Sequence, residues 1–403
     1  MATELTAGTT AGTTAGTTAG TTARTTAEMA TPAGFRTITA AVATAKGEPF
    51  SIRQARIRGP KDDEVLVRVV ATGLCHTDLI VRDQYYPVPL PAVLGHEGAG
   101  IVEEVGAAVK DLKPGDHVVL TYGACGYCKS CSGGHGAYCK HFFGLNFGGG
   151  DLEGRTAIED EEGRPLHDHF FAQSSFGSFA LARGNNAIKV PHDAPLELLG
   201  PLGCGIQTGA GAVINSLKVR PGSSFASLGA GAVGLSSVMA ARVAGATTII
   251  AVDVVPSRLA LAKELGATHT INSREVDLIE AIREISGGGV DFALESTGRA
   301  DVLSQGIEAL GSLGAIGVVG APPLGTRAEF DINSLLLGGR TIRGIVEGDS
   351  VPQTFIPQLV QLYQQGRFPF DKLVRFYPLE RINEAAQDSS SGITLKPILR
   401  FAH

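Results

Sequence analysis

The sequence predicts an α/β protein of two domains, a β-rich domain of antiparallel strands and a doubly wound parallel sheet. Its 403 residues give room for both. In the first half, short runs that alternate apolar and polar residues are separated by turn residues such as Gly59-Pro60, which predicts half-buried antiparallel strands. From about residue 199, apolar runs alternate with helical patterns, and this order predicts parallel strands covered by helices on both faces.

In the first half, strands are expected at residues 37–42 and 64–70, and a turn leads into another strand at 113–119. Residues 141–175 are rich in glycine and aromatic side chains, so we expect them to be irregular. The tail, residues 1–34, repeats Ala-Gly-Thr-Thr and has almost nothing to bury. We therefore expect it to be disordered.

The second half is expected to be regular. Pro256 suits the first position of a helix that continues to Leu265, with Gly266 as its stop. Three other helical patterns are expected. One opens at residues 203–209, one ends near residue 244, and one spans residues 351–364. The expected strands are short apolar runs at 225–228, 247–254, 269–271, 290–294, 315–319 and 397–401.

Composition excludes several classes of function. The chain is 43% hydrophobic and 18% charged, its formal charge is −6, and it has no long run of Lys or Arg, which argues against nucleic-acid and anionic-membrane partners. No apolar run reaches the roughly 18 residues that a membrane span needs. Six cysteines in a chain of this length suggest a reducing, cytoplasmic location rather than a disulfide scaffold.

Four cysteines follow the spacing C-x2-C-x2-C-x7-C, namely Cys125, Cys128, Cys131 and Cys139. Four thiolates this close can surround one Zn²⁺ tetrahedrally and leave no position for substrate, so the site would be structural. Free or disulfide-bonded cysteines are one alternative. A nucleic-acid zinc knuckle is another, which the nearly uncharged loop and the acidic chain argue against.

A glycine-rich turn, Gly229-x-Gly231-x-x-Gly234, follows an expected strand and opens an expected helix. This context predicts a dinucleotide site, in which the glycines let the backbone approach a pyrophosphate at the helix N-terminus. Asp253 ends the next strand and could bind a ribose 2′-hydroxyl, which favours NAD over NADP, although Arg258 nearby weakens that preference. A simple packing turn is the alternative.

The two remaining cysteines, Cys75 and Cys204, form a Cys2His set with His96, and such a set leaves one zinc position open for catalysis. Glu97 could be a neighbouring carboxylate or an occasional ligand. Asp78 could accept a hydrogen bond from His96 and orient its ring. Taken singly, each residue could instead be an ordinary buried cysteine or histidine.

Together these motifs resemble the zinc-dependent medium-chain alcohol dehydrogenases. The resemblance rests on Gly95-His96-Glu97-Gly98-Ala99-Gly100, the four-cysteine lobe, Gly203-Cys204-Gly205 and the Gly229 turn, and it covers residue 36 to the C-terminus. Several stretches are similar to bacterial aryl-alcohol (benzyl alcohol) dehydrogenases, and geraniol and perillyl alcohol dehydrogenases are similar in the same places, at residues 73–78, 82–91, 202–211, 344–348 and 368–373. Aryl or allylic primary alcohols are therefore the expected substrates.

The resemblance implies roles for individual residues. Cys75, His96 and Cys204 would hold a catalytic zinc, the four lobe cysteines would hold a structural zinc, and NAD would be the second cofactor. Thr77 would hydrogen-bond the alcohol, and Ile80 stands where many relatives have a proton-relay histidine. The implied cofactor contacts are His76 and Lys396 at the pyrophosphate and Thr208 and Val233 at the nicotinamide. Phe170 and Phe171 would line the substrate pocket or be ordinary core aromatics.

The resemblance also implies an architecture. A GroES-like catalytic domain would span residues 35–205, a Rossmann domain would span 206–346, and residues 347–403 would return to the catalytic domain. A homodimer or homotetramer is implied, with Val318-Val319 in the strand region that joins subunits. Polyol, cinnamyl-type, short-chain and formaldehyde-type dehydrogenases, a physiological aldehyde reductase and a catalytically silent relative are the alternatives. Loss of the zinc ligands would be expected in a silent relative, and this chain keeps all of them.

Overall fold

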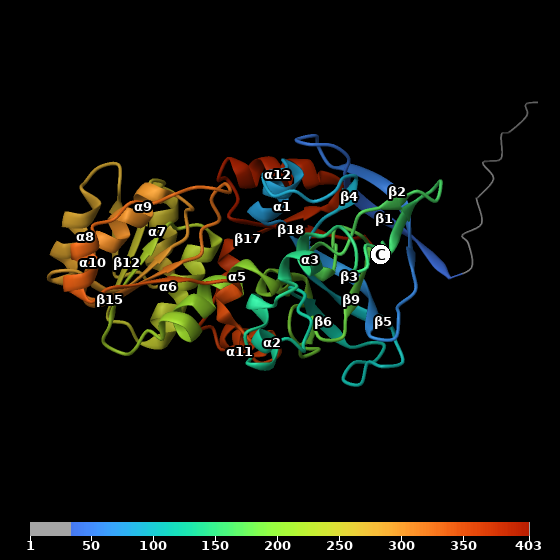
Figure 1. Ribbon diagram of the computed structural model, residues 1–403, viewed down its shortest axis with the longest axis horizontal. Coiled ribbons are helices and arrows are strands. Elements are labelled where there is room, and N and C mark those ends of the chain that lie inside the picture. The colour runs from blue at the N-terminus through green and yellow to red at the C-terminus, as the bar shows by residue number, and fades with distance from the viewer. Residues whose placement is uncertain (1–33, 403) are drawn as a thin grey trace, which may run out of the picture.

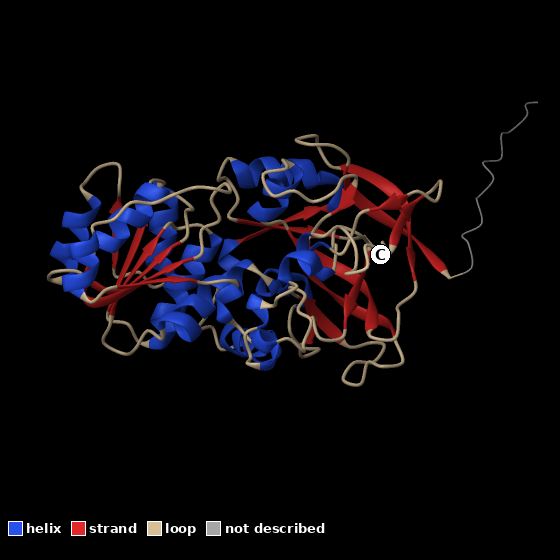
Figure 2. Cartoon of the chain, viewed as in Figure 1, coloured by secondary structure: helices blue, strands red, loops and turns tan. Residues whose placement is uncertain are grey.

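The computed structural model describes residues 34–402 (Figure 1). The tail that was expected to be disordered lies outside the described residues, except for Gly34. The chain forms two domains (Figure 2). One contains the six-stranded sheet and its helices, and the other contains the two remaining sheets. The predicted fold class, a β-rich domain joined to a doubly wound parallel sheet, is confirmed.

The β-rich domain contains two sheets. In the seven-stranded sheet the order is β10-β6-β5-β3-β18-β17, and β9 also pairs with β3. Its strands are β3 (Glu64–Gly73), β5 (Glu97–Val105), β6 (His117–Leu120), β9 (Phe179–Arg183), β10 (Ala187–Lys189), β17 (Val374–Pro378) and β18 (Lys396–Arg400). The five-stranded sheet, β4-β1-β2-β7-β8, contains β1 (Phe35–Ala43), β2 (Ser51–Arg58), β4 (Ala92–Val93), β7 (Ile158–Asp160) and β8 (Pro165–Leu166). Apart from β17 with β18, the paired strands are antiparallel, as expected.

The parallel sheet has six strands in the order β13-β12-β11-β14-β15-β16. They are β11 (Ser224–Leu228), β12 (Thr248–Asp253), β13 (His269–Asn272), β14 (Val290–Glu295), β15 (Leu310–Val318) and β16 (Thr341–Gly344). Helices lie on both faces (Figures 1 and 2), namely α6 (Ala232–Ala244), α7 (Pro256–Leu265), α8 (Leu278–Ser286), α9 (Ala300–Glu308) and α10 (Ile332–Gly338). The chain order reverses at β11, and ligands of such sheets bind beyond the carboxyl ends of the strands at that point.

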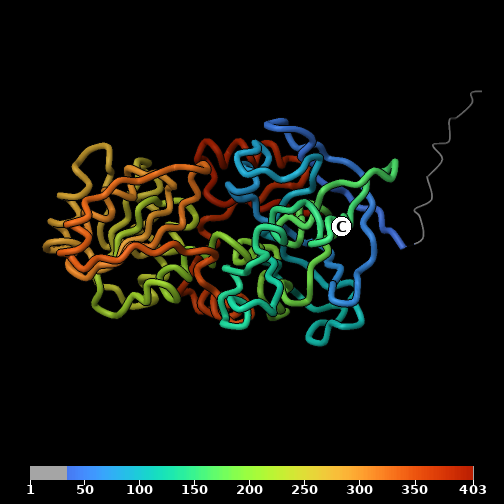
Figure 3. The backbone as a smooth tube through the Cα atoms, in the orientation of Figure 1, coloured from blue at the N-terminus to red at the C-terminus, as the bar shows by residue number. Residues whose placement is uncertain are grey.

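Local signals fixed several boundaries. Helix α7 begins at Pro256 and ends before Gly266, whose φ of 123° suits glycine. The C-terminal segment crosses back to the β-rich domain, where β18 pairs antiparallel with β3 (Figure 3). Five further helices belong to the β-rich domain and its contact with the parallel-sheet domain. They are α1 (His76–Arg82), α4 (Leu196–Leu199), α5 (Gly205–Gly211), α11 (Pro352–Gln364) and α12 (Ile382–Ser390).

The expectation for residues 141–175 was wrong, because that stretch contains regular structure. It holds α3 (Phe142–Phe147), the β7–β8 hairpin and a short 3-10 helix, η2 (Phe170–Ala172). The strands of the hairpin have three and two residues, too few for an alternating pattern to be visible in sequence. Four non-glycine residues after the hairpin have positive φ, namely His169, Phe171, Ala172 and Ser174.

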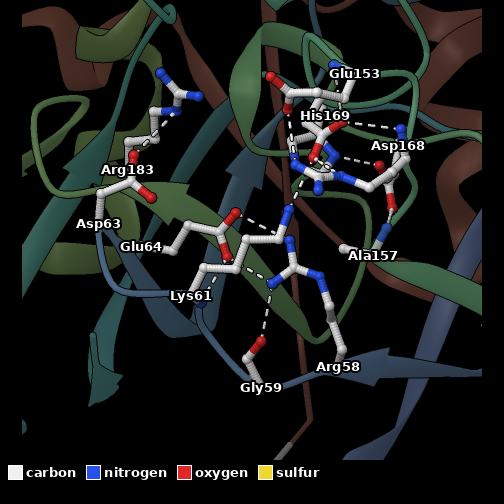
Figure 4. A network of polar contacts seen from close by, with 12 residues as sticks. Arg58, Gly59, Lys61, Asp63, Glu64, Glu153, Ala157, Asp168, His169 and Arg183 are labelled. Carbon is white, nitrogen blue, oxygen red and sulfur yellow. Dashed lines mark hydrogen bonds and ion pairs between the residues drawn. The ribbon is translucent and has the colours of Figure 1, made fainter. Parts of the chain in front are cut away.

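A polar network holds this segment against the β2–β3 turn (Figure 4). Lys61 reaches Asp151 at 2.8 Å, and its backbone N–H donates to Glu64. Asp168 accepts from His169 and from the backbone N–H of Ala157. Surrounding structure must hold a backbone with several left-handed residues, so these contacts position the segment that carries Phe170 and Phe171.

Two further expectations concern surfaces. Within residues 34–402 no helix is long and apolar enough to cross a membrane. The strand that contains Val318 was expected to join subunits, but β15 lies inside the sheet between β14 and β16. The edge strand on that side of the sheet is β16, which follows β15 in the chain and lies next to it in the sheet.

Candidate metal centres and dinucleotide site

Two clusters of metal-type side chains lie in the described part of the chain. One contains the four lobe cysteines, and the other contains Cys75, His96, Glu97 and Cys204. In each cluster the ligand atoms all lie within 4.8 Å of one another. The structure therefore brings together both sets of residues that the sequence singled out.

The lobe cysteines surround a common point. The sulfur of Cys131 is 3.5 Å from that of Cys128 and 3.9 Å from that of Cys125, and Cys128 and Cys139 are 4.0 Å apart. Sulfurs that share one tetrahedral zinc at about 2.3 Å lie about 3.8 Å apart, whereas disulfide sulfurs lie at about 2.05 Å. The spacing fits zinc, and all the cysteines are free.

The backbone of the lobe favours ionised sulfur. The lobe contains helix α2 (Lys129–Ser132) and the 3-10 helix η1 (Gly136–Tyr138). The sulfur of Cys139 accepts from the backbone N–H groups of Cys125 and His141. The N–H groups of Cys131 and Lys140 lower the pKa of Cys128 to about 6. Burial raises the pKa of Cys131 to about 12 and raises that of Cys139 as well. Thiolates are the form that binds metal, so Cys128 is the lobe sulfur that the backbone prepares most for a cation.

The second cluster is assembled from three separate segments. Cys75 caps α1, His96 lies between β4 and β5, and Cys204 lies at the bend between the 3-10 helix η3 (Gly200–Gly203) and α5. Gly95 has a φ of 89°, and a Cβ there would lie 2.5 Å from Phe176. Only glycine fits at this position, and it turns the chain so that His96 points inward.

Asp78 orients two of these segments. Its Oδ1 is 2.9 Å from Nδ1 of His96, and its carboxylate also accepts from the backbone N–H groups of Cys75 and Gly95. Burial lowers the pKa of His96, but the Asp78 carboxylate raises it further, so the pKa lies well above its usual value. Nε2 of His96 is buried without a hydrogen-bond partner, which is the vacancy expected of a metal ligand.

The two sulfurs of this cluster behave as a pair. The hydrogen bond with Cys204 is the main cause that holds the pKa of Cys75 well below its usual value, and the same bond raises the pKa of Cys204. The lowered pKa favours the thiolate of Cys75, which is the form that binds metal. Together with Nε2 of His96 the two sulfurs form a donor set that suits zinc.

Glu97 and Lys396 bind each other. Nζ of Lys396 lies 2.8 and 2.9 Å from the two carboxylate oxygens, and both side chains are buried. Burial lowers the pKa of Lys396, but Glu97 raises it further, so the ammonium stays charged. The predicted roles of Glu97 as an occasional ligand and of Lys396 at a pyrophosphate stay predictions, since either requires this pair to loosen.

The glycine turn has the geometry of a phosphate cradle. Gly229 has a φ of 103°, and a Cβ at Gly234 would lie 1.9 Å from the carbonyl oxygen of Gly229. A Cβ at Gly231 would meet no atom within 4 Å, so the side of the turn at Gly231 is open. Such an open cradle at the start of α6 suits a pyrophosphate.

Asp253 lies beside this turn, at the end of β12. Its carboxylate accepts from the backbone N–H groups of Ala230, Val254 and Val255. Arg258 lies 3.8 Å away, close enough to reduce the repulsion of a 2′-phosphate that was expected from Asp253 alone.

The open cluster and the glycine turn are neighbours. A Cβ built on Gly205 would lie 3.5 Å from Oε1 of Glu97 and 3.7 Å from both Nζ of Lys396 and Cγ2 of Val233. Helix α5 therefore touches the metal-type cluster on one side and the first turn of α6 on the other. Two bound groups at these places would lie close together.

The remaining predicted residues surround the cluster. Oγ1 of Thr77 is 3.8 Å from the sulfur of Cys75, and His76 is exposed at the start of α1. Thr208 is half-buried on α5. The ring of Phe171 stacks on that of His96 at 4.5 Å, and Phe170 meets it edge-on at 5.2 Å.

The sequence analysis missed Glu347. It follows Val346, which comes shortly after β16, and its Oε1 lies 3.7 Å from the sulfur of Cys204. Burial raises its pKa to about 7. Glu347 lies in the stretch 344–348 that supports the resemblance, but no role was assigned to it, because its contact with Cys204, 143 positions away, is visible only in the tertiary structure.

Comparisons with known proteins agree with this geometry. Residues 61–165 match the model for the alcohol dehydrogenase GroES-like domain, and residues 232–365 match the model for zinc-binding dehydrogenases. The geraniol dehydrogenase of Castellaniella defragrans is 46% identical over 368 residues, which are 91% of this chain and 98% of that protein.

Two solved structures are also similar. Benzyl alcohol dehydrogenase from Acinetobacter calcoaceticus is 63% identical, with a TM-score of 0.89 over 91% of this chain and all of that one. An alcohol dehydrogenase zinc-binding domain protein from Burkholderia ambifaria is 80% identical, with a TM-score of 0.91 over 92% and 100%. The chain belongs to the zinc-dependent medium-chain alcohol dehydrogenases.

Zinc and NAD are the cofactors typical of this alcohol dehydrogenase family, so both predictions are confirmed at that level. Each group also has a fitting place in the structure. The orphaned Nε2 of His96 between two paired sulfurs fits zinc, and the open side of Gly231 fits a dinucleotide.

Two glycine variants separate cofactor binding from packing in this alcohol dehydrogenase. Gly231→Ala adds a methyl group into open space, so we expect unchanged Tm and an NADH Kd raised about tenfold or more, which is about 1.4 kcal/mol or more. Gly234→Ala drives a methyl group into the carbonyl of Gly229 and should lower Tm instead. Fluorescence titration and thermal unfolding measure the two quantities, and unchanged NADH binding by Gly231→Ala would contradict the cradle.

Proposed function

We propose that this alcohol dehydrogenase oxidises a primary aryl or allylic alcohol, with benzyl alcohol as the type, to the aldehyde with NAD. The observation that carries the proposal is an aromatic wall beside His96. Phe171 and Phe170 contact the His96 ring, and Phe147 packs on both at 5.1 and 5.7 Å. Tyr86 extends the wall at 6.1 Å from Phe147. Flat rings suit the edge-on and offset contacts that such a wall offers.

The identities of the relatives support the same substrate class. A benzyl alcohol dehydrogenase and a geraniol dehydrogenase both align over nearly their whole lengths. Their alcohols are aryl and allylic respectively. The other dehydrogenase classes weighed from the sequence are outcomes of the substrate test below.

We assign the open zinc site to Cys75, His96 and Cys204, and the closed site to the four lobe cysteines. Each subunit would thus hold two zinc ions. In the open site, two thiolates would balance the charge of the cation, while the Glu97–Lys396 pair is itself neutral. Opposite charges that pair in a buried site reduce its desolvation cost.

When bound, zinc supplies a Lewis acid that lowers the pKa of the alcohol hydroxyl, and NAD supplies the hydride acceptor. The chain supplies position. Thr77, next to Cys75, accepts the hydrogen bond of the alcohol hydroxyl. The side chain of Ile80 has no group that could pass the proton on, so the proton would leave by a route that does not include this position. Thr208 and Val233 would contact the nicotinamide ring.

A substrate panel tests the proposal. NADH formation should give a kcat/KM for benzyl alcohol and geraniol at least about 100-fold above that for ethanol, because a missing ring or chain forfeits several kcal/mol of apolar contact. Sorbitol, cinnamyl alcohol and S-hydroxymethyl-glutathione complete the panel. A preference for ethanol, sorbitol or the glutathione adduct would contradict the proposal.

We also propose that two or four copies assemble and that the protein works in the cytoplasm, which its free cysteines suit. The support for assembly is an apolar face at the β16 edge of the parallel sheet. Its exposed side chains on β15, on α10 and in the nearby loops are Leu313, Leu324, Phe330, Ile332, Leu336 and Leu337. An edge strand, paired on one side only, beside large exposed leucines suits pairing with a second copy.

One substitution at this face tests the assembly. Leu337 is 85% exposed, and Leu337→Glu should shift the mass measured by light scattering toward the monomer. Val276→Glu, at an exposed position remote from the β16 edge, is the matched control and should leave the mass unchanged. A wild-type protein with the mass of a monomer would contradict the proposal.

A further inference from the structure

Residues 347–349, which we call the strap, connect the end of the parallel sheet to α11. All three have positive φ, with values of 49° at Glu347, 67° at Gly348 and 48° at Asp349. Two of them are not glycine, and a left-handed backbone at such residues costs about 1–3 kcal/mol each unless its surroundings hold it. The contacts that hold the strap in this conformation therefore indicate its function.

One end of the strap lies against the open metal site. Glu347 is buried, with Oε1 at 3.7 Å from the sulfur of Cys204. Its other oxygen accepts from Gln207 at 3.2 Å and from Thr208 at 3.5 Å, both on α5. Gly348 allows the close approach, because a Cβ on Gly348 would lie 2.5 Å from the backbone carbonyl oxygen of Gln207 on α5.

The other end of the strap is held by the cysteine lobe. The hydroxyl of Tyr138, which directly precedes Cys139, donates to Oδ1 of Asp349 at 2.6 Å. The same hydroxyl accepts from the backbone N–H of Val346 at 3.4 Å, on the other side of Glu347. Tyr138 thus bridges the residues that flank Glu347 and Gly348.

Asp349 is anchored from the parallel-sheet domain as well. Its other oxygen accepts from Arg343 at 2.7 Å and from Ser216 at 2.8 Å. The lobe tyrosine therefore completes a contact that fixes the strap from two domains. A shift of Asp349 would move Glu347, two residues away, relative to Cys204.

We propose that Tyr138 is a positioning residue that couples the four-cysteine lobe to the open metal site, by holding the strap so that Glu347 lies against Cys204. The inference rests on the assignment of the two zinc sites above. It gives the lobe a part in the open site in addition to supporting its own loop. Polar groups around metal ligands typically change metal affinity by 10- to 100-fold when they are removed.

Zinc release to a chelator tests the coupling in the intact holoenzyme. Tyr138→Phe removes only the hydroxyl, and we expect zinc in the open site to leave about tenfold faster. Tyr127→Phe is the matched control, because Tyr127 lies on the same lobe with 65% exposure and makes no contact with the strap. Cys75→Ala protein should retain only the lobe zinc, so its release curve identifies the kinetic phase that belongs to the lobe zinc. The rate of this phase should not change with Tyr138→Phe.

A double-mutant cycle and a spectrum distinguish this role from general loosening. In a Glu347→Gln background, Tyr138→Phe should have less than a twofold further effect, because both act through one contact. Cobalt placed in the open site should show a shifted ligand-field spectrum in Tyr138→Phe and not in Tyr127→Phe.

Equal release rates for the two tyrosine variants would overturn the inference, as would faster release of the lobe zinc or an undiminished effect in the Glu347→Gln background. Two zinc ions per chain with no effect of Tyr138→Phe would contradict this inference alone. Absence of zinc from the purified wild-type protein would contradict the site assignment and, with it, this inference.

Discussion

The buried hydrogen bond between Asp78 and His96 is the contact on which the candidate active site depends. The same carboxylate accepts from the backbone N–H groups of Cys75 and Gly95, so it joins two segments that are 20 residues apart in the chain. It also leaves Nε2 of His96 without a partner beside the sulfurs. A buried nitrogen in this state costs free energy unless a cation binds it. The geometry around Nε2 of His96 is therefore the geometry expected of a metal site.

Helix α5 links this site to the cofactor. It begins directly after Cys204, and Gly205 lies close to both Glu97 and Val233 at the start of the dinucleotide cradle. A short helix of small residues lets the two domains approach each other there. Reaction between two bound groups requires this proximity, since held geometry can supply a large part of the rate advantage of such a step.

Local chemistry made much of the fold and site predictable. Pro256 and Gly266 define α7 through backbone constraints that act at any position, and the cysteine spacings identify ligands because a metal requires donors close in space. Long-range packing explains what was missed. The Glu97–Lys396 pair joins residues 299 positions apart, and Glu347 reaches Cys204 across 143 positions. The β7–β8 hairpin is too short to leave a pattern.

The central claim is that one polypeptide holds two zinc ions in sites of different purpose, and metal analysis of matched variants tests it most directly. Wild-type protein should contain two zinc ions per chain. Cys75→Ala should contain one, keep the wild-type Tm within a few degrees and lose alcohol oxidation, whereas Cys128→Ala should lose the lobe zinc and unfold at a lower temperature. Full activity of Cys75→Ala, or of metal-free wild-type protein, would contradict the account.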